Sequence, residues 1–138
     1  MQTILDILKH AGGWHHGLHL TIANPPFGEL DIEAMEEFGP QGLPALSVVQ
    51  FGEQNSDLMR DPEMCFELGF AGGAHLNPFY WRNDFIGVEQ SSRFLADGMY
   101  VHDSELHKRH EDFAALWDDA LRRQGAVEAF TRQPAQPA

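Results

Sequence analysis

Apolar and polar positions alternate along the first two thirds of the chain, and this alternation predicts a series of short β-strands. The clearest run covers residues 64–70, where Met64, Phe66, Leu68 and Phe70 alternate with smaller or polar residues. Comparable runs, bounded by glycine, proline or asparagine, predict further strands at residues 18–22, 30–35, 45–51, 78–82 and 88–94. Because successive side chains of a strand point to opposite faces, these segments favour a sheet with one buried face.

Apolar residues recur with a helical period at both ends of the chain. Near the start, a short amphipathic helix is predicted, with Thr3 as its N-cap and Gly12–Gly13 as its stop. Toward the end, a long amphipathic helix is predicted to begin at Asp103 or Ser104 and to end at Gly125. Glycine readily adopts the left-handed conformation that ends many helices, so these glycines mark helix ends.

The order of these elements indicates the fold class. Strands joined by short connections and followed by a long helix favour an α+β fold, in which an antiparallel sheet of five or six strands carries a short N-terminal and a long C-terminal helix on one face. Helices do not alternate with the strands, so a doubly wound parallel sheet is not expected. With 138 residues, the chain suits a single domain, expected over residues 1–130, followed by a flexible tail at residues 131–138.

A dense polar segment separates two of the predicted strands. It is interpreted as a loop, and its polar residues are Glu53, Gln54, Asn55, Asp57, Arg60, Asp61 and Glu63. Such a loop is either a hydrogen-bonded turn or a binding surface. Its asparagine, aspartate and proline signals are typical of a structured connection, so we expect Asp57, Arg60 and Asp61 to hold the turn in shape. Any further role of these residues is expected to be recognition rather than catalysis.

Negative charge is concentrated in the middle of the chain. The net charge is −12, and residues 29–67, which we call the acidic block, hold ten acidic residues against Arg60 alone. Such a surface repels phosphate backbones, so direct binding of nucleic acid is not expected. The expected partner is a protein with a basic surface. The expected contact residues are Glu33, Glu53, Asp57, Arg60, Asp61, Glu63 and Glu67.

Several classes of protein are disfavoured by what the sequence lacks. No apolar run approaches the roughly 20 residues of a membrane-spanning helix, and the first residues do not resemble a signal peptide. The single cysteine, Cys65, cannot form an internal disulfide, so a cytoplasmic location is expected. Ser91 and Ser92 lack the glycine flanks of a nucleophile elbow, and no phosphate-binding loop or other cofactor motif occurs. These features favour a role without catalysis or a cofactor.

Two groups of residues are candidate metal ligands. Asp57, Asp61 and Glu63, with His75, offer the oxygen and nitrogen ligands that divalent cations take, although their spacing does not match a calcium-binding EF-hand loop. His107 and His110 lie three residues apart on the predicted helix, where they would face the same side and bind zinc with His102 or Glu111 as a third ligand. The alternative is that the first group holds the loop and the histidines lie on the helix surface.

Two segments of the chain carry a resemblance to a known family. GEQNSDLMRDPEMCFEL and YWRNDFIGVEQ resemble the "EQNGDLMRDPEM" loop and the "YxRxDxxGxEQ" hairpin of a small bacterial domain family of unknown function, carried largely by plasmids and integrative elements. The resemblance covers about residues 30–94. It implies a soluble cytoplasmic protein encoded on mobile DNA, and no activity to transfer. Ser56 stands where the family often has glycine, so this turn is expected to adopt a positive φ less freely.

Three functions remain open from the sequence. The leading one is a non-catalytic acidic module of a mobile genetic element that binds a protein through the acidic block, with antagonism of a basic nucleic-acid-binding host protein, including DNA mimicry, as a special case. The second is a metal-dependent hydrolase that uses Asp57, Asp61 and Glu63. The third is a structural domain that assembles through a sheet edge or its terminal helix.

Overall fold

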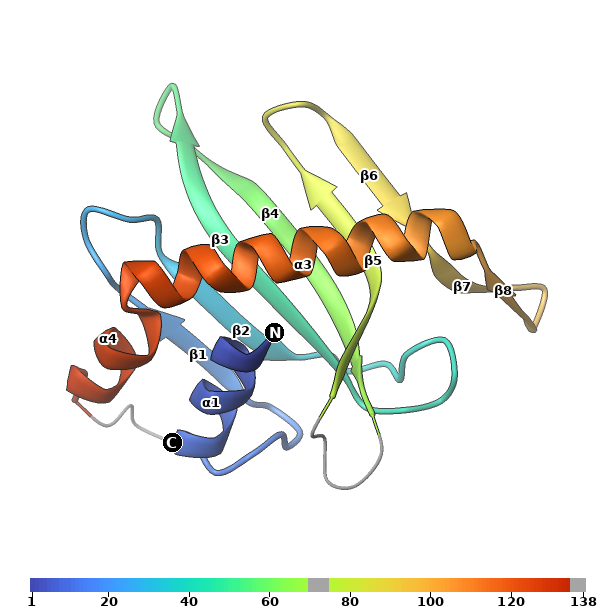
Figure 1. The fold of residues 1–138 in the computed structure, drawn as a ribbon, viewed down its shortest axis with the longest axis horizontal. Helices are drawn as coiled ribbons and strands as arrows, with labels where there is room; N and C mark the ends of the chain where they lie inside the picture. Colours follow the sequence, from blue (N-terminus) through green and yellow to red (C-terminus); the bar gives the residue numbers. More distant parts are fainter. Residues whose placement is uncertain (70–74, 135–138) are drawn as a thin grey trace.

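A six-stranded antiparallel sheet with helices on one face forms the body of the protein (Figure 1). The computed structural model describes residues 1–69 and 75–134. The strands lie side by side in sequence order, and they are β1 (His19–Ile22), β2 (Leu30–Ala34), β3 (Ala45–Gln54), β4 (Asp57–Leu68), β5 (Leu76–Asn83) and β6 (Val88–Ser91). This arrangement confirms the expected α+β fold.

The helix-facing side of the sheet holds the main hydrophobic core. Leu46 lies opposite Phe66 and Val48 lies opposite Met64 in the β3–β4 ladder, and all four side chains are buried. Because side chains alternate along a strand, the residues between these four point to the other face. Ile32 on β2 extends the same buried layer.

Three helices cover this core: α1 (Gln2–His10), α3 (Ser104–Gln124) and α4 (Ala126–Arg132). In Figure 1, α3 crosses the sheet, and α1 and α4 pack together on one side of α3. The ends of α3 follow the prediction, since the Asp103 carboxylate accepts a hydrogen bond from the Leu106 N–H at 3.1 Å and Gly125 is left-handed with φ 76°. None of the described helices combines the length and apolar character that a membrane span needs.

The start of α1 differs from the prediction. The helix begins at Gln2 with Met1 as its N-cap, and Thr3 is a buried helical residue. The Thr3 N–H donates to Asp118 Oδ1 at 2.8 Å, so a carboxylate of α3 satisfies a free donor in the first turn of α1. The cap comes from a residue far away in the sequence, which a local pattern does not reveal.

The polar segment at residues 53–63 is not a loop, which corrects the sequence interpretation. Strand β3 continues to Gln54 and β4 begins at Asp57, so only Asn55 and Ser56 form the turn. Both turn residues are left-handed, with φ 51° and 69°, as a tight two-residue hairpin turn requires. Ser56 therefore adopts a positive φ without being glycine.

The strand expected at residues 88–94 is also different. Strand β6 ends at Ser91, and a second sheet of two strands follows, β7 (Arg93–Ala96) and β8 (Met99–His102). The chain leaves the main sheet at Ser92, whose N–H donates to the Phe79 carbonyl at 3.0 Å. The two-residue turn between β7 and β8 has the sequence Asp-Gly, a strong hairpin signal that the alternation alone did not reveal.

The ends of two further elements differ from expectation. The strand expected to reach Phe70 ends at Leu68, and Phe70 and the expected turn at residues 71–74 lie outside the described residues. Helix α4 continues to Arg132, beyond the expected domain boundary at residue 130. Residues 135–138 of the expected tail also lie outside the described residues.

A buried ion pair joins the two sheets. Arg93 Nη1 lies 2.6 Å from Glu67 Oε1, and each side chain is 1% exposed. The other carboxylate oxygen of Glu67 accepts hydrogen bonds from the N–H groups of Gln41 at 2.8 Å and Leu43 at 3.3 Å. A Cβ atom on Gly39 would lie 2.0 Å from the Cγ of Glu67, so the loop can close over this carboxylate only with glycine there. Glu67 is therefore not part of an exposed contact surface.

The guanidinium of Arg93 is equally well satisfied. It donates to the carbonyl oxygens of Pro78 and Asn77, both at 3.1 Å, and it lies 5.9 Å from the centre of the Phe79 ring. Since nearly every donor has an acceptor, the large cost of burying the charge is offset. One side chain thus fixes β7 against β4 and β5.

Removal of Arg93 is expected to destabilise the fold strongly. Arg93→Met leaves the Glu67 carboxylate buried without its cation, and we expect the free energy of unfolding in urea to fall by about 3–5 kcal/mol. Arg122→Met, which removes the exposed partner of Asp119, is the matched control and is expected to cost at most about 1 kcal/mol. Equal losses in the two variants would contradict a central role of the buried pair.

Candidate functional site

The face of the main sheet opposite the helices, which we call the open face, carries two rows of side chains that cross all six strands. Directly opposed residues of neighbouring strands share a face, so the strand register defines both rows. One row is Thr21, Asp31, Val49, Glu63, Arg82 and Glu89. The other row is His19, Glu33, Ser47, Cys65, Tyr80 and Ser91. The open face is therefore a polar surface with four carboxylates.

The carboxylates near β5 and β6 are held in place by their neighbours. Glu89 accepts hydrogen bonds from the Tyr80 hydroxyl at 2.6 Å and from Arg82 Nη1 at 3.4 Å. Burial and the hydrogen bond to Glu89 raise the pKa of Tyr80 to about 12, so the phenol remains protonated. Arg82 Nε also donates to Asp84 at 2.8 Å, and this hydrogen bond raises the pKa of Arg82. This part of the open face presents fixed charges rather than a titrating group.

Glu63 and Asp31 occupy the middle of the same face. Glu63 accepts a hydrogen bond from the Ser47 hydroxyl at 2.9 Å and pairs with Arg60 at 3.6 Å. Asp31 Oδ2 lies 3.1 Å from His19 Nε2, and its Oδ1 is buried without a hydrogen-bond partner among the described residues. Glu33 is exposed and has no polar partner in the described part of the chain. The predicted contact residues Glu33 and Glu63 thus lie on one surface.

The thiol of Cys65 lies in the second row but is not a reactive group. Cys65 is buried, and burial raises its pKa to about 12. Only the thiolate is nucleophilic, so the thiol is inert at neutral pH.

The remaining predicted contact residues lie toward the tip of the β3–β4 hairpin. Glu53 and Asp57 are exposed near the turn, and Asp61 Oδ1 accepts a hydrogen bond from Asn83 Nδ2 at 2.7 Å. The Arg60 N–H donates to Asp84 Oδ2 at 2.9 Å, and this hydrogen bond lowers the pKa of Asp84. Arg60 and Asp61 therefore hold the β3–β4 hairpin against the β5–β6 turn. They do not shape the turn at residues 55–56, as the sequence had led us to expect. A local sequence pattern does not reveal Asn83 and Asp84 as their partners, because these lie 22 and 24 residues away in the chain.

The extended backbone separates the candidate metal ligands. Asp57 and Glu63 are six residues apart on one strand, or roughly 20 Å at 3.3 Å per residue. His75 lies beside Gly69, beyond the far end of β4. Among residues 1–69 and 75–134, no group of three or more His, Cys, Asp or Glu side chains is arranged to hold a metal ion. The geometry offers no support for the hydrolase alternative.

The two histidines of α3 are engaged separately. His107 Nε2 lies 2.8 Å from Asn77 Oδ1, and its ring packs edge-on against His102 with the ring centres 4.9 Å apart. His110 is 2% exposed, with Nδ1 2.9 Å from the Ser92 hydroxyl and Nε2 3.2 Å from Gln90 Oε1. The two rings have different hydrogen-bond partners and do not form a common metal site among the described residues. His110 is a core residue instead of a surface one. Burial lowers the pKa of both, and that of His110 falls to about 4.

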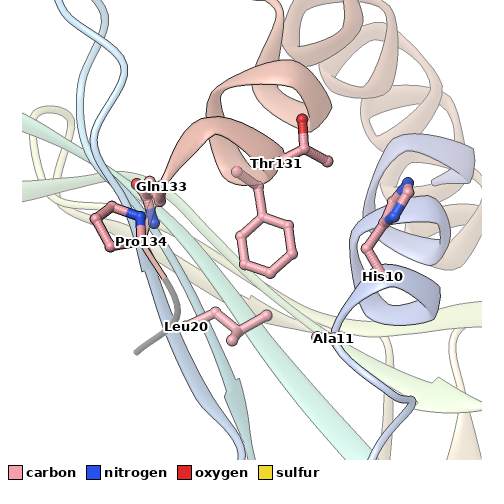
Figure 2. A pocket seen from close by; sticks show the side chains of 7 residues that line it. His10, Ala11, Leu20, Thr131, Gln133 and Pro134 are labelled. Atoms are coloured by element: carbon pink, nitrogen blue, oxygen red, sulfur yellow. The ribbon is translucent and has the colours of Figure 1, made fainter. Parts of the chain in front are cut away.

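A pocket of about 530 Å³ lies between α1, β1 and α4 (Figure 2). Leu20 and Phe130 provide apolar surface, and His10 and Thr131, which are both exposed, also line the pocket. The Gln133 carboxamide accepts a hydrogen bond from the Ala23 N–H at 2.9 Å and donates one to the Thr21 carbonyl at 3.1 Å. It therefore pairs with the backbone of this segment as a neighbouring strand would. The pocket joins three distant segments, so no local pattern predicts it.

The buried state of His110 predicts a defined dependence of stability on pH. In the unfolded chain, imidazole titrates near its ordinary value of 6.5, whereas in the fold the pKa is lowered to about 4. The unfolded chain therefore takes up a proton first, so this group has no effect above about pH 6.5 and costs stability as the pH falls toward 4. We expect a loss of about 3 kcal/mol over this range from His110, measured by urea unfolding at several pH values.

The matched comparison is between His110→Gln and His15→Gln. The first variant is expected to lose this part of the pH dependence, whereas the second, at an exposed histidine, is expected to keep it. An unchanged pH dependence in His110→Gln would contradict the assignment.

Comparison with known proteins assigns a family but no activity. The model of the family described as "Domain of unknown function (DUF6908)" matches residues 2–127. No curated protein and no solved structure shows significant similarity to the chain. The matched segment includes α1, all eight strands, α3 and the start of α4. Since it spans most of the chain, the protein belongs to the DUF6908 domain family.

Proposed function

We propose that the domain is a non-catalytic binding module that contacts a basic protein surface through its open face. The observation that carries this proposal is the strand register, which gathers carboxylates from β2, β4 and β6 on one surface. With Glu53, which continues the alternation of Val49 and Phe51 along β3, the open face holds five carboxylates, against the guanidiniums of Arg60 and Arg82. A surplus of three negative charges on one sheet face attracts a positively charged partner.

The fixed hydrogen bonds on this face support recognition. Glu63 and Glu89 are already oriented by Ser47, Tyr80 and Arg82, so binding would freeze few side chains. Groups that are ordered before binding lose less entropy on association. Glu33, which is exposed and has no described partner, is the carboxylate most available to a partner's cation.

The acidic block does not form a single surface. Glu29 and the hairpin tip lie at one end of the sheet, because the Glu29 carbonyl accepts from the Phe51 N–H, whereas Glu36 and Glu37 follow the opposite end of β2. Glu67 is buried. DNA mimicry requires a regular row of negative charges, and this distribution fits that requirement poorly. We therefore propose contact through the open face alone.

The setting of this proposal comes from the sequence resemblance. The "EQNGDLMRDPEM"-like and "YxRxDxxGxEQ"-like segments suggest a protein encoded on plasmids or integrative elements and acting in the cytoplasm. In that setting the basic partner is a protein of the host or of the mobile element. A nucleic-acid-binding protein is one such partner, since its own binding surface is rich in Lys and Arg.

The test is capture of partners from a lysate of the organism that encodes the chain. We expect the wild-type chain to retain a basic protein whose binding weakens as salt is raised. The variant Glu33→Gln with Glu53→Gln is expected to lose most of this binding. The control, Glu105→Gln with Asp112→Asn, removes two exposed carboxylates of α3 and is expected to keep it. Equal capture by the two double variants, or binding insensitive to salt, would contradict a role of the open face.

The β7–β8 hairpin favours a second candidate, structural assembly through a second copy of the chain. Four large apolar side chains of this hairpin are exposed: Phe94, Leu95, Met99 and Tyr100. Between residues 94 and 101 the only formal charge is Asp97, although the whole chain carries −12. Two acidic copies can meet with little repulsion at so uncharged a surface.

The hairpin candidate predicts self-association that grows stronger with salt, because salt screens the repulsion between two chains of charge −12. This dependence is opposite to that expected for the basic partner. Met99→Asp, at a residue 70% exposed, is expected to give a monomer by light scattering, whereas Leu116→Asp on α3 is expected to associate like the wild type. A wild-type chain that is monomeric at all salt concentrations would exclude this candidate.

A further inference from the structure

A groove of about 290 Å³ lies between α3 and the β5–β6 hairpin, on the helix-covered side of the sheet. Trp81 and Phe113 form its aromatic wall, with ring centres 5.6 Å apart and planes at 74°. Ile86, which is 64% exposed, and Val88 line it from the hairpin. A concave site with apolar walls and a few polar groups has the form of a small-molecule pocket.

The polar groups of the groove are mainly hydrogen-bond donors without an acceptor. Trp81 Nε1 is one of two buried side-chain polar atoms of the described residues that have no hydrogen-bond partner. Gln90 uses its carboxamide oxygen toward His110, which leaves its amide N–H groups without a partner in the described structure. Buried donors are nearly always satisfied in folded proteins, so an unpaired one marks a place where an acceptor is missing.

Arg109 supplies a positive charge at the same place. Glu105 and Asp112 stand four residues before and three residues after it on α3, at spacings that allow ion pairs. Arg109 nevertheless makes no ion pair within the described part of the chain, and it lines the groove instead. None of the described residues that line the groove is a carboxylate, although the chain has 21 acidic residues.

His110 contributes shape but no charge. Its two ring nitrogens are occupied by Ser92 and Gln90, and its lowered pKa keeps the imidazole neutral at physiological pH. Arg109 is therefore the cation of the groove.

We propose that this groove binds a small organic anion with an aromatic or similarly sized apolar body. The apolar part lies against Trp81 and Phe113, and the anionic group accepts hydrogen bonds from Arg109 and Gln90. A charged hydrogen bond to a carboxylate is stronger than a neutral one, so Arg109 selects an anion over an uncharged analogue of the same size. This site lies on the opposite side of the sheet from the open face and does not depend on the protein-binding proposal.

The experiment uses two probes of similar size, the anion 3-phenylpropionate and the uncharged 3-phenyl-1-propanol, titrated into the full ¹⁵N-labelled chain. We expect a saturable shift of the Trp81 indole N–H resonance, assigned with Trp81→Phe, up to probe concentrations of about 10 mM. The carboxylate is expected to bind about five- to tenfold more tightly than the alcohol. Arg109→Gln is expected to reduce carboxylate affinity to that of the alcohol and to leave the alcohol affinity unchanged.

Lys108→Gln is the matched control, because Lys108 is the neighbouring cation on α3 but pairs with Asp112 outside the groove. This variant is expected to keep the preference for the carboxylate, and its backbone spectrum and that of Arg109→Gln report whether the fold is intact. The proposal is overturned if the Trp81 resonance shows no saturable shift, if the wild type binds both probes equally, or if Arg109→Gln keeps the preference.

Discussion

Glu67 and Arg93 form the contact on which the arrangement of the two sheets depends. A carboxylate and a guanidinium that are both almost wholly buried are stable only if their remaining hydrogen-bonding groups are also satisfied. The N–H groups of the loop at residues 41–43 and the carbonyls of β5 meet this requirement. The loop must therefore close over the end of the open face, and β7 must leave the main sheet so that Arg93 can reach Glu67.

The same constraint separates the surfaces of the molecule. Since Arg93 anchors the base of the β7–β8 hairpin, the apolar tip of the hairpin projects away from the main sheet (Figure 1). The open face carries its two rows on the side of the sheet opposite the helices, and carboxylates outnumber guanidiniums there. On the other side of the sheet, α3 leaves a groove beside the β5–β6 hairpin. An acidic face, an apolar hairpin and a donor-lined groove thus occupy three different places, which allows each to be tested separately.

The distribution of partners among polar side chains bears on whether the domain is an enzyme. Two of the three carboxylates that the sequence offered for a metal-dependent hydrolase, Asp61 and Glu63, are each held by a neighbouring donor. The Cys65 thiol remains protonated because it is buried. In contrast, Trp81 Nε1 and the Arg109 guanidinium lack acceptors in the described structure. Unsatisfied groups of this kind are suited to binding a ligand, as we propose for the groove.

The sequence by itself determined the α+β class, the bounds of β1, β2 and β5 to within two residues, and both ends of α3, because alternation and helix capping act between residues that are near in the chain. It placed Asp31 and Glu33 on the polar side of their strand for the same reason. Only the tertiary structure decided that residues 53–63 form a hairpin and that Glu67 is buried. It also decided that His107 and His110 have separate partners. Each of these outcomes depends on a contact between distant segments, such as the 26-residue separation of Glu67 and Arg93, and a local pattern contains no information about which distant residue will be the partner.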